Sequence, residues 1–216
     1  MSFILDAIIS IPMVLIALMF HELAHGYVSM KLGDPTPRLQ GRMTLNPLAH
    51  LDPIGTLLMV FTGFGWAKPV QINPRYYKEP KKGMALTALA GPLANLLLAI
   101  IAMIIYGVIF VISYKTGLFM NSLYTISSLL MQFVTLNLCF MVFNFIPIPP
   151  LDGSRILGVF LSNSAYFKLQ QYEQYSFIAI IVLSATGVFD RVIGTGVGFV
   201  FNTMLSGLEK IVMLVI

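Results

Sequence analysis

Residues 11–25 read IPMVLIALMFHELAH, an apolar run that ends in two histidines and a glutamate. Neighbouring apolar residues extend this run from Phe3 to about Leu32, which is longer than the roughly 20 residues that a membrane-crossing helix needs. No Lys or Arg precedes Lys31, so the stretch lacks the basic start of a secretory signal peptide. We therefore expect a retained membrane helix that carries ionisable side chains.

The composition of the whole chain agrees with a membrane location. Of the 216 residues, 57% are hydrophobic and 10% are charged, and the mean hydropathy is +0.86. A soluble domain carries about 25% charged residues, so a soluble, disordered or nucleic-acid-binding protein is excluded. The single cysteine, Cys139, excludes an internal disulfide. We expect an integral membrane protein whose surroundings are the lipid bilayer.

The hydropathy pattern predicts an all-α polytopic membrane protein with about five transmembrane helices. We expect residues 1–216 to form a single membrane-embedded domain with its catalytic core in about residues 1–160, and residues 175–216 as candidate gating helices, because glycines in this last part lower helix stability. The expected spans are Phe3 to Leu32, Met84 to Ser113, Tyr124 to Ile148, Tyr175 to Phe189 and Val192 to Ile216.

The charges predict the orientation of these spans. The segment 31–82 carries three acidic residues and eight basic ones: Lys31, Arg38, Arg42, Lys68, Arg75, Lys78, Lys81 and Lys82. By the positive-inside rule this segment faces the cytoplasm, which puts the N-terminus outside and, with five spans, the C-terminus inside. The pair Asp190-Arg191 is expected to mark an external turn between the last two spans. The expected location is the cytoplasmic membrane of a prokaryotic cell.

The middle of the segment 31–82 is not a simple polar loop. Residues Ile54 to Trp66 are apolar but too short and too rich in glycine to span the membrane, which favours a re-entrant or β-hairpin-like segment. Residues 66–73 then read as a short strand with a proline near its start. An unwound substrate could pair with such a strand, so Lys68, Pro69 and Val70 are candidate substrate-binding residues.

The histidines and the glutamate form an HExxH motif, His21-Glu22-Leu23-Ala24-His25. Residues i and i+4 share one face of a helix, so both imidazoles can bind one Zn²⁺ while Glu22 acts as general base. With so few His and Glu in the chain, the motif is expected by chance on the order of 10⁻³ times. The alternative is a polar helix end whose histidines are satisfied by hydrogen bonds.

A catalytic zinc ion needs a third protein ligand and an open position for water. The candidates are Asp152, Asp52, His50 and Glu173. Asp152 is favoured because the nearby prolines at 147, 149 and 150 unwind the chain, and because the first and third spans end on the same side of the membrane. In the alternative interpretation Asp152 only caps a backbone amide of a turn.

These motifs resemble the site-2 protease family of intramembrane zinc metalloproteases. Besides HExxH, the resemblance rests on Asn144 to Gly153, Gly91 to Asn95, Leu45 to Pro47 and Gly65 to Val70, over roughly residues 15–160. It implies that a protein substrate is cleaved within a transmembrane segment. By position, His21, His25 and Asp152 would hold the zinc, Glu22 would be the base and Asn144 would contact the substrate or the oxyanion. The chain resembles the compact members without a PDZ or CBS domain.

Several alternatives stay open at this point. Asn95 can bind substrate or pack against a neighbouring helix. Intramembrane His and Asp residues also occur in metal transporters, although such a protein would give Glu22 no special role. A membrane chaperone without catalytic activity could keep the same fold. The sequence identifies neither the substrate nor the oligomeric state.

Overall fold

A computed structural model describes residues 2–52, 54–55 and 68–216 of the chain, and over these ranges it contains helices and no β-strand. Four of the helices are long and apolar enough to cross a membrane: α1 (Ser2–Lys31), α4 (Pro80–Thr116), α5 (Leu123–Phe145) and α9 (Val188–Val215). The shorter elements are α2 (Thr36–Leu39), η1 (Pro47–His50), η2 (Pro74–Tyr76), α6 (Asp152–Leu157), η3 (Gly158–Phe160), α7 (Asn163–Gln171) and α8 (Glu173–Ala185). The predicted all-α polytopic class is confirmed.

The expected fourth span, residues 175–189, differs from the structure. It falls on α8, which has 13 residues and would therefore be about 20 Å long, against a hydrocarbon core of about 30 Å. The expected turn at Asp190-Arg191 is also wrong. The turn lies at Gly187, which adopts φ 69°, a left-handed conformation that glycine takes without steric cost. Asp190 and Arg191 instead lie at the start of α9.

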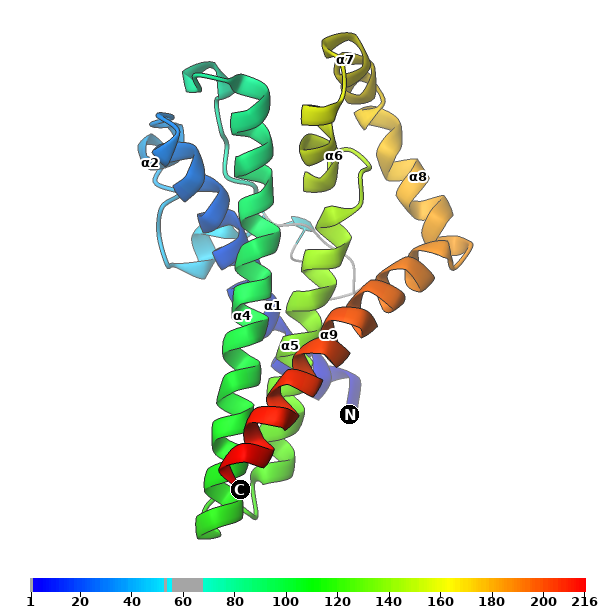
Figure 1. The fold of residues 1–216 in the computed structure, drawn as a ribbon. Helices are drawn as coiled ribbons and strands as arrows, with labels where there is room; N and C mark the ends of the chain where they lie inside the picture. Colours follow the sequence, from blue (N-terminus) through cyan, green and yellow to red (C-terminus); the bar gives the residue numbers. More distant parts are fainter. Residues whose placement is uncertain (1, 53, 56–67) are drawn as a thin grey trace. The chain divides into compact units, whose positions relative to one another are not determined.

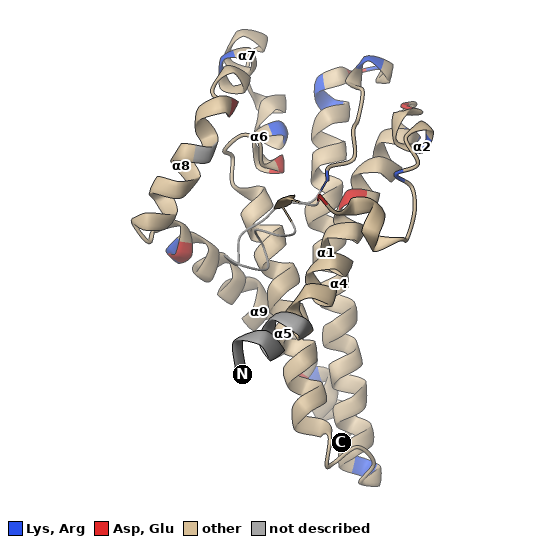
Figure 2. Cartoon of the chain, turned by 180° about the vertical axis from the view of Figure 1, so that it is seen from behind, with Lys and Arg blue, Asp and Glu red and all other residues tan. Residues whose placement is uncertain are grey.

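Figure 1 labels the helices of the chain, which divides into two compact units. Unit 1 comprises residues 1–94 and 144–173, and unit 2 comprises residues 95–143 and 174–216. Because α4 and α5 each contribute to both units, the boundaries fall inside helices and not in linkers. Figure 2 shows that the long helices of unit 2 contain almost no Lys, Arg, Asp or Glu residues.

Unit 2 is held together by apolar packing between α4, α5 and α9. Its buried core consists of Ala99, Ala102, Met103, Val134, Leu138, Met141 and Val197. Small residues allow close approach of the helices, as membrane helix packing requires: a Cβ atom added at Gly107 would lie 2.5 Å from Leu208 Cδ1, and one at Gly196 would lie 2.8 Å from Val142 Cγ1.

The ends of two helices in unit 2 bear on the expected topology. Lys115 Nζ, at the end of α4, donates a hydrogen bond to the carbonyl oxygen of Val215, at the end of α9, over 2.6 Å. Both helices therefore end on the same side. The positive-inside rule places the segment 31–82 inside, so α4 leads outward and Lys115 is expected outside. The C-terminus shares the side of Lys115, which corrects the expectation that the C-terminus lies inside.

Unit 1 contains the chain segments that the sequence analysis found most irregular. The apolar stretch from Ile54 to Trp66, expected to be re-entrant, lies almost entirely outside the described residues. The short strand expected over 66–73 is wrong in its described part, since residues 68–73 have no regular secondary structure. Pro69 lacks an N–H group, and the amides of Val70 and Asn73 donate to the carboxylates of Glu22 and Asp34 over 2.7 Å each. The side chains of Glu22 and Asp34 therefore engage backbone amides that the hydrogen-bond ladder of a β-strand would need.

Candidate metal centre

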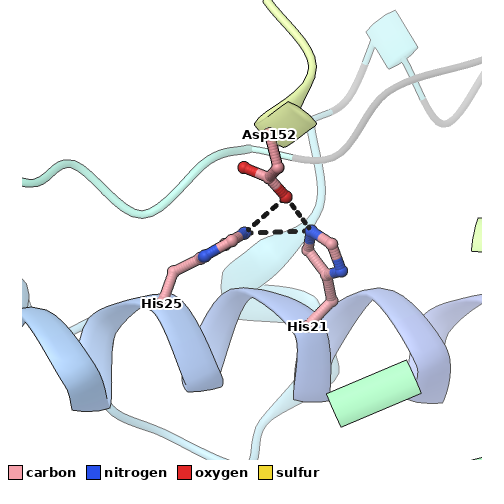
Figure 3. A group of neighbouring side chains, drawn as sticks. All are labelled: His21, His25 and Asp152. Carbon is pink, nitrogen blue, oxygen red and sulfur yellow. Dashed lines mark hydrogen bonds and ion pairs between the residues drawn. The ribbon is translucent and has the colours of Figure 1, made fainter. Parts of the chain in front are cut away.

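Three side chains in unit 1 converge on one point (Figure 3). Both imidazoles project from α1, and the Oδ2 atom of Asp152, the first residue of α6, lies 3.3 Å from His21 Nε2 and 3.2 Å from His25 Nε2. The two Nε2 atoms lie 3.0 Å apart. No exposed fraction of these side chains exceeds 11%. Among the described residues this is the one group of three or more His, Cys, Asp or Glu side chains suited to a metal ion.

The spacing of these three atoms fits a zinc ion. Tetrahedral zinc binds His nitrogen and carboxylate oxygen at about 2.0–2.2 Å, which separates neighbouring ligand atoms by roughly 3.3–3.5 Å. The three separations of 3.0, 3.2 and 3.3 Å are close to this range. Asp152 Oδ2 is buried and accepts no hydrogen bond. A buried carboxylate oxygen without a donor, facing two imidazole nitrogens, has the chemistry of a metal ligand.

The protonation of His25 also suits a metal ligand. Its Nδ1 atom lies 2.7 Å from the backbone carbonyl oxygen of Thr87 on α4. A carbonyl can only accept, so Nδ1 carries the proton and the Nε2 lone pair points to the metal centre. Histidines that bind a metal commonly donate the proton of their other ring nitrogen to a carbonyl oxygen in this way, which fixes the tautomer and the ring orientation.

Asp152 begins α6 at a point where the backbone passes close to the end of α5. Gly153 allows the Asp152 carboxylate to approach, because a side chain at that position would overlap the carbonyl group of Phe145 at the end of α5. The Asp-Gly pair is therefore required as a unit.

A glycine on α4 leaves the space that the imidazoles occupy. A Cβ atom added at Gly91 would lie 2.5 Å from His21 Cε1 and 2.5 Å from His25 Nε2. Real Cβ atoms essentially never show contacts this short, so a larger residue at position 91 would require the two rings to shift. Gly91 lies in the stretch from Gly91 to Asn95 that supports the family resemblance. Thr87 has no such sequence signal, because it contacts His25 through a backbone atom.

Glu22 is half-buried, and its carboxylate contacts the backbone of the segment 68–70. Its Oε2 atom accepts a hydrogen bond from the backbone amide of Val70 over 2.7 Å. Val70 itself is buried, with 7% exposure. The N–H of Lys68 donates to the carbonyl oxygen of His50 over 2.8 Å, and Pro69 has none. Residues 68–70 therefore have their backbone donors engaged before any substrate arrives.

The other candidate residues have different surroundings. His50 Nε2 contacts the carbonyl oxygen of Thr44 over 2.9 Å, and Asp52 accepts from the amides of Ile54 and Gly55. Neither they nor Glu173 join the group of three. Asn144 lies half-buried in the last turn of α5. The side chain of Asn95 is fully buried in unit 2 and donates to Asn137 Oδ1 over 3.1 Å, which favours the packing role.

Known proteins similar to this chain are zinc metalloproteases by name. The chain is 40% identical over 178 residues to "Putative zinc metalloprotease YwhC" of Bacillus subtilis, covering 80% of this chain and 78% of that protein. It is 27% identical over 184 residues to "Putative zinc metalloprotease Rip2" of Mycolicibacterium smegmatis, covering 82% and 66%. It is 29% identical over 157 residues to "Zinc metalloprotease MJ0392" of Methanocaldococcus jannaschii, covering 71% and 34%. No family model matches the chain, and neither does a solved structure.

The relatives and the structure agree on the class of protein. Four helices are long and apolar enough to cross a membrane, and one of them carries two histidines of a group that could hold a metal ion. A relative with 40% identity over most of both chains is named a zinc metalloprotease. The chain is an integral membrane enzyme that uses zinc, and it belongs to the site-2 protease family of membrane zinc metalloproteases.

Proposed function

We propose that this enzyme hydrolyses peptide bonds within or near the transmembrane segments of membrane-protein substrates. The observation that carries the proposal is the position of the metal centre: His21 and His25 project from α1, a helix that is itself long and apolar enough to cross the bilayer. A soluble substrate would have no reason to reach a site on such a helix. A transmembrane segment shares its environment.

In this proposal His21, His25 and Asp152 hold one zinc ion. Zinc with three protein ligands supplies Lewis-acid polarisation of a water molecule and of the scissile carbonyl. Glu22 accepts the proton of the attacking water and later delivers it to the leaving amine. The Val70 amide holds Glu22 Oε2, which limits the orientations of the carboxylate. The side chain of Asn144 contacts the substrate or stabilises the oxyanion.

A helical substrate must unwind before its peptide bond is attacked, because its carbonyls are engaged in hydrogen bonds to residues four positions along the chain. We propose that residues 68–70 receive the unwound segment. Since Val70 already donates to Glu22 and Lys68 to His50, the incoming segment has to replace one of these bonds or contact side chains. Residues 1–160 would hold the catalytic core, and the helices of 175–216 would gate entry.

The proposed location is the cytoplasmic membrane of a prokaryotic cell, which the bacterial and archaeal sources of the relatives support. We expect Lys78 on the cytoplasmic side and Lys115 outside. Single cysteines at these two positions, in a Cys139→Ala background, are tested with a membrane-impermeant thiol reagent on intact cells. Labelling at position 115 alone agrees with this orientation, and labelling at position 78 alone reverses it.

The role of Glu22 is tested with purified enzyme and a model transmembrane substrate. Glu22→Gln keeps the shape of the side chain but removes the base, so we expect full zinc content and a loss of about 10²–10⁴-fold in cleavage rate. Glu79→Gln, an exposed glutamate paired with Lys82, serves as the matched control and is expected to cleave normally. Near-normal cleavage by a zinc-loaded Glu22→Gln enzyme would refute the assignment.

A further inference from the structure

A buried chain of side-chain hydrogen bonds leads from the loop after α1 to the first turns of α4. Asp34 Oδ2 accepts from Ser29 Oγ over 2.8 Å, Ser29 Oγ lies 2.7 Å from the Tyr77 hydroxyl, and that hydroxyl lies 3.1 Å from Thr87 Oγ1. Asp34, Ser29 and Thr87 are fully buried, and Tyr77 is 5% exposed. Four polar side chains buried together in this way need one another as partners.

The donors along this chain of hydrogen bonds all point in one direction. The carboxylate of Asp34 can only accept a hydrogen bond, so the Ser29 hydroxyl donates its one proton to Asp34 Oδ2. Ser29 Oγ must then accept from the Tyr77 hydroxyl, and the Tyr77 oxygen must accept from Thr87 Oγ1. The order of donation is Thr87 to Tyr77 to Ser29 to Asp34. The negative charge of Asp34 therefore fixes the orientation of the Thr87 hydroxyl three bonds away.

Asp34 is itself anchored from two sides. Its Oδ1 atom accepts from the amide of Thr36 over 2.9 Å, which is an ordinary turn contact after a helix. Its Oδ2 atom also accepts from the amide of Asn73 over 2.7 Å, and Asn73 is 39 positions away in the sequence. A local cap would not need this second oxygen. Asp34 therefore connects the end of α1 with the segment that precedes α4.

Thr87 connects this chain of hydrogen bonds to the candidate metal centre. Its hydroxyl donates to Tyr77, and its carbonyl oxygen accepts the proton of His25 Nδ1 over 2.7 Å. A threonine hydroxyl inside a helix usually bonds to a carbonyl of the preceding turn, so its use by Tyr77 is a tertiary contact. The ring of Tyr77 packs directly against Gly83 on the same helix, where a side chain would overlap it. Tyr77 thus contacts α4 at two points one turn apart.

We propose that Asp34, Ser29, Tyr77 and Thr87 are positioning residues, whose hydrogen-bond chain holds the Thr87 carbonyl against His25 and so fixes the tautomer and orientation of that zinc ligand. This inference rests on the proposed zinc site. It extends the site's support beyond the HExxH helix to a carboxylate in the loop after α1. None of the four side chains belongs to the group of three that would hold the metal.

The test measures zinc affinity in the purified protein by competition with a chromophoric chelator. Tyr77→Phe removes one hydroxyl and keeps the ring that packs on Gly83, and Thr87→Val removes the other hydroxyl and keeps the branched shape. Removing an outer-shell partner typically weakens metal binding 10–100-fold, and because these hydroxyls act through Thr87 we expect about 10-fold for each. Thr87→Ser restores the hydroxyl and should bind zinc close to normally. Tyr76→Phe, at a tyrosine that is 53% exposed, is the matched control.

A second readout separates positioning from general stability. Cobalt(II) in place of zinc reports ligand geometry through its visible absorption bands, which we expect to shift in Tyr77→Phe and Thr87→Val and not in Thr87→Ser or Tyr76→Phe. A lower melting temperature together with normal zinc affinity and a normal cobalt spectrum would overturn the inference and leave a structural role alone. His25→Ala tests the site itself: if it retains stoichiometric zinc, the proposed zinc site is wrong and the inference falls with it.

Discussion

Units 1 and 2 share the helices α4 and α5 but are built on different principles. Unit 2 contains five charged residues, Lys115, Asp190, Arg191, Glu209 and Lys210, and a core of aliphatic side chains. Unit 1 contains all the other charged residues, together with the candidate metal centre and the buried hydrogen-bond chain from Asp34 to Thr87. In a bilayer, aliphatic packing needs shape complementarity alone, whereas every buried polar group needs a partner. Unit 1 should therefore be the more sensitive to single polar changes.

Two helical glycines, Gly91 in unit 1 and Gly194 in unit 2, have opposite surroundings. In unit 1 a Cβ atom at Gly91 would meet two imidazoles at 2.5 Å, whereas in unit 2 one at Gly194 would meet nothing within 4 Å. We expect Gly91→Ala to displace His21 and His25 and to weaken zinc binding and cleavage at least about 100-fold. Gly194→Ala should keep full zinc content. Equal zinc content in the two variants, measured by elemental analysis, would remove this contrast.

The charge of Asp34 gives unit 1 a pH dependence. Burial alone would raise the pKa of Asp34, but hydrogen bonds from Asn73, Thr36 and Ser29 outweigh it and hold the pKa below its usual value. A folded pKa below the unfolded value of about 3.9 gives stability that is present above that pH and is lost as the pH falls through the folded pKa.

Asp34→Asn should therefore cost roughly 1–3 kcal/mol at pH 6, since a hydrogen bond to a charged group is worth about that much. The difference in melting temperature between the wild type and Asp34→Asn should shrink between pH 6 and pH 3. A difference that stays constant over this range would show that the charge of Asp34 contributes nothing to stability.

A smaller effect is expected for the glycines of α9. Gly194 and Gly198 have open space where a Cβ atom would lie, so Ala fits at both positions and should stabilise the helix by up to about 1 kcal/mol each. If the helices of 175–216 bend to admit the substrate, the double variant should melt higher and cleave a transmembrane substrate several-fold more slowly, with normal zinc content. A higher melting temperature with unchanged cleavage would remove α9 from the entry step.

The smallest effect is expected for Asn95. Its amide donates to Asn137 in unit 2, and such interhelical hydrogen bonds in membranes average about 0.6 kcal/mol. Asn95→Ala should lower the melting temperature slightly and leave KM unchanged. A clear rise in KM with normal stability would restore the substrate-binding role that the sequence left open.

The parts of the molecule that follow from local pattern were predictable from the sequence. The lengths of the apolar runs predicted the four long helices, and the i, i+4 spacing predicted that His21 and His25 share one helix face. The hydropathy pattern also predicted one span too many, the fourth, where the structure has the shorter α8, because hydropathy does not locate a turn. Gly187 interrupts an apolar run whose two sides look alike in composition.

The support of the site was not predictable in the same way. Thr87 orients His25 through a carbonyl oxygen, which every residue has, and Ser29, Asp34 and Tyr77 carry no spacing that distinguishes them from surface residues. The strand expected at residues 66–73 failed for a related reason, since a propensity pattern does not show that Glu22 and Asp34 take the amides of Val70 and Asn73.

The central claim is that His21, His25 and Asp152 together hold one zinc ion. The most direct measurement is the zinc content of purified wild-type protein and of the variants Asp152→Ala and Asp52→Ala, determined by elemental analysis after dialysis against a weak chelator. We expect about one zinc per chain in the wild type and in Asp52→Ala, and far less in Asp152→Ala, since the remaining two ligands bind zinc weakly. Zinc retained by Asp152→Ala and lost from Asp52→Ala would contradict the claim.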